Sequence, residues 1–351
     1  MGYVLFMLYF DVTMPVTLFA VTLVAILLDR RVEGKLKTSF EKKEFHTSDA
    51  ILFMAMIIAI VSAIVFAPQM AILVIFLFSY STLLFTVSYV FSDMQKKRAQ
   101  LFCMIFIVAS GLAGAAGFFG LFPESVRFSG TLAFAELAVC AFFALMYEQY
   151  GSDVKKRWYL AVLPPALFIL LYLAYNGTGL WFPYLFNAYG MMFAVLVTLY
   201  LGSLFSWRNV LIFAGLLTIM DIVLVLFTGV MVTAAKQVSG LGLPVLISLP
   251  TVPLIVTEWG LQYMSLGLGD FFFAGILATQ TFKKFGKRTA VLSVLTMSLS
   301  FAVFEAFLMN YQWGAFPGTL MIICGWLPVV AGKLFAGRKT SNNRVEELGQ
   351  K

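Results

Sequence analysis

Histidine, cysteine and charged residues are all scarce in this chain. Its 351 residues include one histidine, three cysteines and only 12% Asp, Glu, Lys and Arg. His46 lies in a basic stretch, and Cys103, Cys140 and Cys324 lie in three separate apolar segments, so neither residue type has metal-site spacing. A zinc protease of the His-Glu-x-x-His type and a serine–histidine relay are therefore excluded. We expect no metal and no organic cofactor.

Apolar residues, by contrast, make up 61% of the chain, which is incompatible with a soluble globular domain. Eleven apolar runs are long enough to cross a bilayer. Because lipid offers backbone groups no hydrogen-bond partner, these runs should be helices. The sequence therefore predicts an all-α, polytopic transmembrane helical bundle. The runs are Tyr3–Leu28, Ala50–Ala67, Met70–Phe91, Leu101–Leu121, Thr131–Tyr147, Trp158–Tyr175, Leu180–Phe205, Val210–Val232, Met264–Phe282, Val291–Met309 and Trp313–Phe335.

The basic residues alternate between the two sides of this predicted bundle. All but two of the 24 Lys and Arg residues fall in the links of one side, and the two exceptions are Arg127 and Lys236. By the positive-inside rule, this predicts an integral protein of the cell membrane with its N-terminus outside and its C-terminus in the cytoplasm. The net charge of +7 thus reflects topology, and no nucleic acid partner is expected. The first run lacks basic residues ahead of it and a small-residue cleavage site, so we expect a span and not a removable signal peptide.

Five acidic residues lie inside apolar runs: Asp11, Glu136, Asp221, Asp270 and Glu305. The ordinary explanation for one such residue is a carboxyl group that faces the bundle interior, protonated or hydrogen-bonded. Glu305 lies about one helical turn from the end of its run, within reach of the membrane interface, so we favour the ordinary explanation for it. No motif surrounds Asp11 or Glu136, and structural roles are expected for both.

Asp221 and Asp270 differ because they lie in consecutive predicted helices and can face each other. We expect Asp270 about two turns into its helix, after Gly267 and Gly269, which permit close backbone approach. No Lys or Arg lies in either run to neutralise a carboxylate. Two carboxyls in one dry site share a proton, as general acid–base catalysis by aspartic proteases requires. A proton-coupled transporter also fits such a pair, so the residues alone leave both functions open.

The motifs around this pair resemble one known family. "IMDIVLVLFTG" and "GLGD" are similar to the two catalytic motifs of presenilins and signal peptide peptidases, which are intramembrane aspartyl proteases. "TGVMVTAAK" and "GLPVLISLP" resemble the signal peptide peptidase branch, as does the predicted inside-to-outside sense of the Asp221 helix. The family's Pro-Ala-Leu motif appears in altered form as Pro317-Gly318-Thr319, and Met220 replaces a usual Tyr. The resemblance covers roughly Val210–Gly325.

The resemblance implies an aspartic endopeptidase with Asp221 and Asp270 as the catalytic dyad. Gly267, Gly269, Pro317, Gly318 and Thr319 would support the active site, and remnant signal peptides or other transmembrane helices would be substrates. The family's nine-helix core implies a two-helix extension at residues 1–69, first core helices at 70–209, the catalytic part at 210–336 and a cytoplasmic tail at 337–351. A prepilin-type Gly-x-Gly-Asp peptidase is an alternative, but its acids would lie nearer to basic loops.

The linker from Thr233 to Tyr263, between the predicted helices that carry Asp221 and Asp270, is too broken by Gly and Pro for a spanning helix. Within it, Leu243–Pro250 is an apolar, β-branched segment with prolines near both ends, which predicts an isolated strand without an internal partner. We expect it to pair with an unwound substrate. Alternatively, it is a re-entrant plug that seals the outer mouth. The predicted substrate contacts in it are Leu243, Pro244, Val245, Leu246, Ile247 and Ser248.

Overall fold

The computed structural model is mostly helical and describes residues 9–39, 55, 69–150, 157–258, 260–311 and 315–349. Seven helical segments of this described part are long and apolar enough to cross a membrane. They expose many large hydrophobic side chains, such as Leu112 and Phe143, as expected for faces that contact lipid. The seven segments are Lys96–Leu121, Glu124–Tyr150, Trp158–Tyr175, Trp181–Gly202, Trp207–Phe227, Lys287–Tyr311 and Gly318–Ala336.

The chain therefore forms an integral, polytopic helical membrane protein. The predicted run Ala50–Ala67 falls almost wholly outside the described residues. The count of eleven spans, the nine-helix core and the N-terminal extension thus stay predictions. The chain divides into two compact units, which are described separately. Unit 1 comprises residues 1–66, 190–236 and 245–351, and unit 2 comprises residues 67–189 and 237–244.

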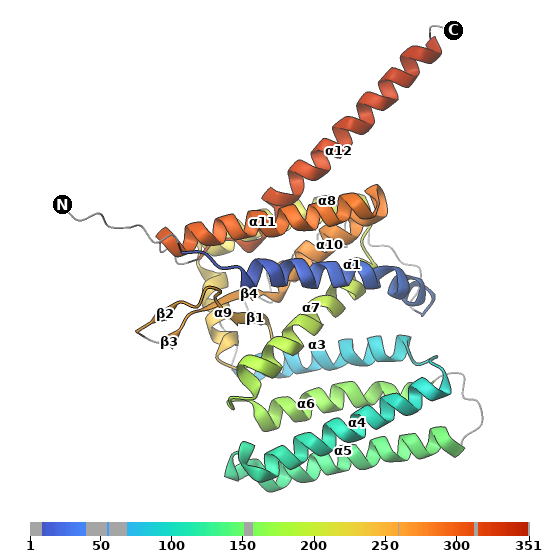
Figure 1. The fold of residues 1–351 in the computed structure, drawn as a ribbon, viewed down its shortest axis with the longest axis vertical. Helices are drawn as coiled ribbons and strands as arrows, with labels where there is room; N and C mark the ends of the chain where they lie inside the picture. Colours follow the sequence, from blue (N-terminus) through green and yellow to red (C-terminus); the bar gives the residue numbers. More distant parts are fainter. Residues whose placement is uncertain are drawn as a thin grey trace, which may run out of the picture. The chain divides into compact units, whose positions relative to one another are not determined.

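Unit 2 is a bundle of four helices that run side by side (Figure 1). They are α3 (Gln69–Val90), α4 (Lys96–Ala116), α5 (Glu124–Tyr150) and α6 (Leu163–Tyr175). Two short turns of π or 3-10 helix, η1 (Gly117–Leu121) and η2 (Trp158–Val162), adjoin these helices, and a third, η3 (Trp181–Leu185), lies beyond α6 in the chain.

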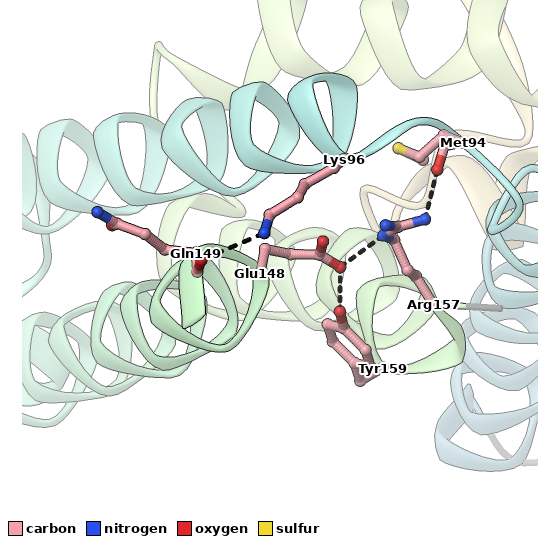
Figure 2. A network of polar contacts seen from close by, with 6 residues as sticks. All are labelled: Met94, Lys96, Glu148, Gln149, Arg157 and Tyr159. Carbon is pink, nitrogen blue, oxygen red and sulfur yellow. Dashed lines mark hydrogen bonds and ion pairs between the residues drawn. The ribbon is translucent and has the colours of Figure 1, made fainter. Parts of the chain in front are cut away.

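A buried ion pair joins three segments of unit 2 (Figure 2). Arg157 Nε donates to Glu148 Oε1 at 2.6 Å, and Arg157 Nη1 donates to the Met94 carbonyl at 2.5 Å. The Tyr159 hydroxyl donates to the same Glu148 oxygen. Because both charged groups are buried and hydrogen-bonded, the cluster ties the end of α5 to the entrance of α4 and to η2.

Side chains of unit 2 also hold residues 241–244 of the linker by donating hydrogen bonds to their backbone carbonyls. The Tyr172 hydroxyl donates to the Leu241 carbonyl at 2.7 Å, and the Trp181 indole donates to the Gly242 carbonyl at 2.8 Å. The Tyr80 hydroxyl donates to the Pro244 carbonyl at 2.9 Å. Each contact satisfies a backbone acceptor in a stretch without regular secondary structure.

Unit 1 is organised around α10 (Leu268–Phe285), in which every residue from Phe271 to Thr281 is buried. A helix buried on all sides is a central one. Around it pack α1 (Thr13–Ser39), α8 (Trp207–Ile222), α11 (Lys287–Tyr311) and α12 (Gly318–Gly349). Helix α7 (Phe186–Gly202) enters unit 1 at Gly190, and the π-helical η4 (Val223–Phe227) extends α8.

Two glycines let helix backbones of unit 1 approach closely. A Cβ placed on Gly275 of α10 would lie 2.4 Å from Thr198 Cγ2 of α7. A Cβ on Gly325 of α12 would lie 2.2 Å from the Thr296 carbonyl oxygen of α11. Only glycine fits at Gly325, because the group that it faces is backbone and cannot rotate away.

The prediction that Met264–Phe282 is helical throughout is wrong. This stretch begins as a strand, β4 (Tyr263–Gly267), which pairs antiparallel with β1 (Leu246–Pro250). The predicted run Val210–Val232 is interrupted at Gly229, where φ is 65°, and the helix that follows, α9 (Val230–Ser239), is too short to span a membrane. The short strands β2 (Val256–Thr257) and β3 (Gly260–Leu261) form a second hairpin between β1 and β4. Apolar composition alone does not separate a membrane helix from a buried strand.

The close α11–α12 contact yields a stability prediction. We expect Gly325→Ala to lower the free energy of unfolding by about 1–3 kcal/mol, because its methyl group has to push two backbones apart. Gly332→Ala is the matched control on α12, since nothing lies within 4 Å of its added Cβ. That control should be neutral or slightly stabilising, because alanine favours helix. Thermal unfolding in detergent measures both, and equal stabilities would contradict the inferred contact.

Candidate active site

Asp221 is buried near the end of α8 and is hydrogen-bonded to the beginning of α12. The Thr319 hydroxyl donates to Asp221 Oδ2 at 2.6 Å, and the Thr319 backbone N–H donates to the same oxygen at 3.3 Å. Both groups are 4–7% exposed. The first turn of a helix has unpaired N–H groups and a positive dipole end, so it favours a carboxylate. The sequence predicted Thr319 near the site, but not this pair of donors.

Asp270 lies in the first turn of α10, not two turns into it as predicted. The difference arises because β4 continues to Gly267, which is the N-cap of the helix. The Gly267 backbone N–H donates to the Asp270 carboxyl, as in the reciprocal half of a capping box. Asp270 is partly exposed, whereas Asp221 is buried.

The two carboxyl groups converge on neighbouring residues of α12. A Cβ placed on Gly318 would lie 2.5 Å from Asp270 Oδ1, while the next residue, Thr319, holds Asp221. The carboxyls are close enough to interact electrostatically. The structure thus brings together Asp221, Asp270, Gly318 and Thr319, and Pro317 lies buried just before them.

The expected close backbone approach at Gly269 is not found. No atom of the described residues lies within 4 Å of a Cβ placed there, and Gly269 is exposed. A Cβ on Gly267 would meet only the Asp270 carboxyl, at 3.3 Å, and the Gly269 nitrogen. These glycines therefore leave open space beside Asp270 instead of admitting a neighbouring helix. With Gly318 partly exposed as well, this is the accessible side of the carboxyl pair.

Strand β1 does have an internal partner, which corrects the linker prediction. Leu246 pairs with Gly267, and the Leu268 N–H donates to the Val245 carbonyl at 3.0 Å. Ile247 is completely buried in the core of unit 1, opposite Leu266. The ladder therefore ends directly at the first turn of α10 and fixes where that helix begins.

One edge of β4 carries no second strand among the described residues. Hydrogen-bonded and non-hydrogen-bonded pairs alternate along an antiparallel ladder. Because Val245 and Leu268 form a hydrogen-bonded pair, the third pair along, Ser248 and Ser265, is a non-hydrogen-bonded one. The Ser265 N–H and C=O therefore point away from β1, although the two serine hydroxyls contact each other at 2.8 Å.

Leu243 and Pro244, the first two predicted linker contacts, belong to unit 2. Both are buried there, and the Pro244 carbonyl accepts the Tyr80 hydroxyl. Val245, Leu246 and Ser248 belong to unit 1, in or next to β1.

The other three acidic residues of the predicted apolar runs lie elsewhere. Asp11 caps α1 by accepting the N–H groups of Thr13 and Met14, and it also accepts the Val252 N–H at 2.8 Å. Glu305 is 1% exposed and therefore faces the interior, and neither of its carboxyl oxygens has a hydrogen-bond partner among the described residues. Glu136 is exposed on α5.

No cluster of three or more His, Cys, Asp or Glu residues suited to a metal occurs in the part of the chain that the structure describes. No protein-family model matches the chain, and no curated protein matches it. The family resemblance therefore rests on the sequence motifs alone.

The contrast between Asp11 and Glu305 predicts opposite effects on stability. Asp11→Ala removes the acceptor for three backbone N–H groups, so we expect a loss of about 1–3 kcal/mol in the free energy of unfolding. Glu305→Met removes an unpartnered buried carboxyl while keeping its volume, so we expect a gain of about 1–3 kcal/mol. Chemical or thermal unfolding in detergent measures both. A destabilised Glu305→Met variant would show that this carboxyl has a stabilising partner.

Proposed function

We propose that this chain is an intramembrane aspartyl endopeptidase with Asp221 and Asp270 as its catalytic dyad. One observation carries the proposal: carboxyls from two helices meet at Gly318 and Thr319, beside open space at Gly269. The "GLGD" motif and the altered Pro-Gly-Thr motif, far apart in sequence, contribute to one site. That is the arrangement the resemblance to signal peptide peptidases implies.

The chemistry follows from two carboxyls that share one proton. The charged carboxyl removes a proton from water as the water oxygen attacks the peptide carbonyl. The protonated carboxyl gives its proton to the carbonyl oxygen, so the tetrahedral intermediate forms without net charge. The newly protonated carboxyl then protonates the leaving nitrogen as the C–N bond breaks, and the newly charged carboxyl removes a proton from a hydroxyl of the intermediate, which becomes the new carboxyl group. No metal or organic cofactor enters these steps.

The proposed substrates are single transmembrane helices that lie cytoplasm-to-outside, such as remnant signal peptides. A helix hydrogen-bonds its own carbonyls, so the substrate has to unwind before hydrolysis. The open edge of β4 ends three residues before Asp270. An unwound segment that adds to this edge as a strand would have its next peptide bonds at the dyad. This replaces β1 alone as the proposed docking strand.

We also propose that a nine-helix core beginning near Met70 carries the protease, with two further helices before it. The charge distribution supports an N-terminus outside the cell membrane and a C-terminus in the cytoplasm.

Isosteric removal of either carboxyl tests the dyad. We expect Asp221→Asn and Asp270→Asn each to reduce cleavage of a model transmembrane peptide by roughly 10²- to 10⁴-fold, because neither amide transfers a proton in place of the acid. The double variant should be no worse than the single variants, since the residues act as a unit. Mass spectrometry of the peptide fragments measures cleavage.

The same assay separates the rival functions. Wild-type protein that leaves every peptide intact, but moves a solute when a proton gradient is applied to proteoliposomes, would favour a proton-coupled transporter. Substantial cleavage by either single variant would remove the dyad assignment.

The open strand edge is tested at Ser265. Ser265→Pro deletes an N–H that points away from β1, so the β1–β4 ladder keeps its hydrogen bonds. We expect a fall of about tenfold in kcat/KM for a helical peptide, from one lost backbone hydrogen bond to the substrate. Ser265→Ala is the matched control, because it also lacks the hydroxyl but keeps the N–H. Equal cleavage by the two variants, both folded, would contradict strand addition at this edge.

A further inference from the structure

The two carboxyls of the proposed dyad have unequal surroundings. Asp221 Oδ2 accepts two hydrogen bonds from one residue, the Thr319 hydroxyl at 2.6 Å and the Thr319 N–H at 3.3 Å. A backbone N–H can only donate, so this oxygen has to be an acceptor. Asp270 has one backbone donor, from Gly267, and lies on the accessible side. Hydrogen bonds to a carboxylate favour its charged form.

We propose that Thr319 is a positioning residue that makes Asp221 the charged, proton-accepting member of the dyad and leaves Asp270 as the proton donor. The proposal rests on the proposed peptidase function and assigns the two roles within it. Thr319 acts only through Asp221: it is 4% exposed. Its hydroxyl fixes the carboxylate plane through Oδ2 and leaves Oδ1 for the attacking water.

The proton transfers balance under this assignment. Asp221 takes one proton from water as the water oxygen bonds to the peptide carbon, and Asp270 gives its proton to the carbonyl oxygen. The gem-diol that results is neutral, Asp221 is protonated and Asp270 is charged. Asp221 then protonates the leaving nitrogen as the C–N bond breaks, and Asp270 recovers a proton from a gem-diol hydroxyl.

Asp270 is the titratable group that acts on Asp221 at close range. The charged residues of the helices that pack against α8 lie far along those helices. Arg208 of α8 and Lys283 of α10 are each 13 residues from the nearest dyad carboxyl in sequence, which corresponds to about 20 Å of helix. Lys333 of α12 lies 14 residues beyond Thr319, about as far. None of them substitutes for the Thr319 hydroxyl.

The test compares Thr319→Val, Thr319→Ser and the wild type. Valine keeps the shape and the backbone N–H but loses the hydroxyl, so we expect kcat for peptide cleavage to fall roughly 10- to 100-fold, with KM little changed. Serine should restore most of the rate. In Thr319→Val the acid limb of the pH–kcat/KM profile should also move to higher pH, because the charged form of Asp221 has lost a donor.

Thr218→Val on α8 is the matched control. Thr218 is a buried threonine one turn before Asp221, and its hydroxyl bonds to the Ala214 carbonyl of its own helix at 2.8 Å. It should keep the wild-type rate and pH profile. Thermal unfolding of all variants in detergent identifies losses due to misfolding.

The outcomes are distinguishable. If the wild type cleaves, the Asp→Asn variants do not, and folded Thr319→Val keeps the wild-type kcat and pH profile, the role of Thr319 is overturned while the peptidase stands. A folded serine variant as slow as the valine variant overturns it too. Wild-type protein without any cleavage overturns both the peptidase and this assignment.

Discussion

A carboxyl group in an apolar protein interior has to find its hydrogen-bond donors within the protein, and in unit 1 two helix N-termini supply them. Asp270 lies in the first turn of α10, and Asp221 is held by the first turn of α12. Free N–H groups and the positive dipole ends of both helices favour negative charge. The cost of removing these carboxyls from water is thus offset by backbone N–H groups that are already in place. The points at which α10 and α12 begin therefore decide the geometry of the pair.

A different structural feature determines where each of the two helices, α10 and α12, begins. The β1–β4 ladder runs up to Gly267 and forces the chain to change from strand to helix there. Pro317 precedes α12, where its missing N–H costs nothing. Glycine contacts then bring the helices together, because α12 approaches α11 at Gly325 and α7 approaches α10 at Gly275. A shift in any of these would move one carboxyl relative to the other.

The sequence predicted the helical membrane architecture well, because a span has a length and composition that few other structures share. It also singled out Asp221, Asp270 and Pro317–Thr319, which the fold places together. It failed where apolar composition does not distinguish structures. Tyr263–Gly267 has a composition that also suits a membrane helix, but it pairs as a strand because β1 is its antiparallel partner. Glu148 and Arg157, which form a buried ion pair, gave no signal because partners of opposite charge are identified only by the fold.

The residue types in the Pro317-Gly318-Thr319 segment have a physical role in this geometry. An alanine at position 318 would place its Cβ 2.5 Å from Asp270 Oδ1, closer than two such atoms can lie. Glycine therefore lets the Asp270 carboxyl lie directly against the first turn of α12. A leucine at position 319 would leave Asp221 with a backbone N–H only, whereas threonine adds a hydroxyl at 2.6 Å. Glycine at position 318 and threonine at position 319 thus act in the same direction: both bring the N-terminus of α12 into closer contact with the carboxyl pair.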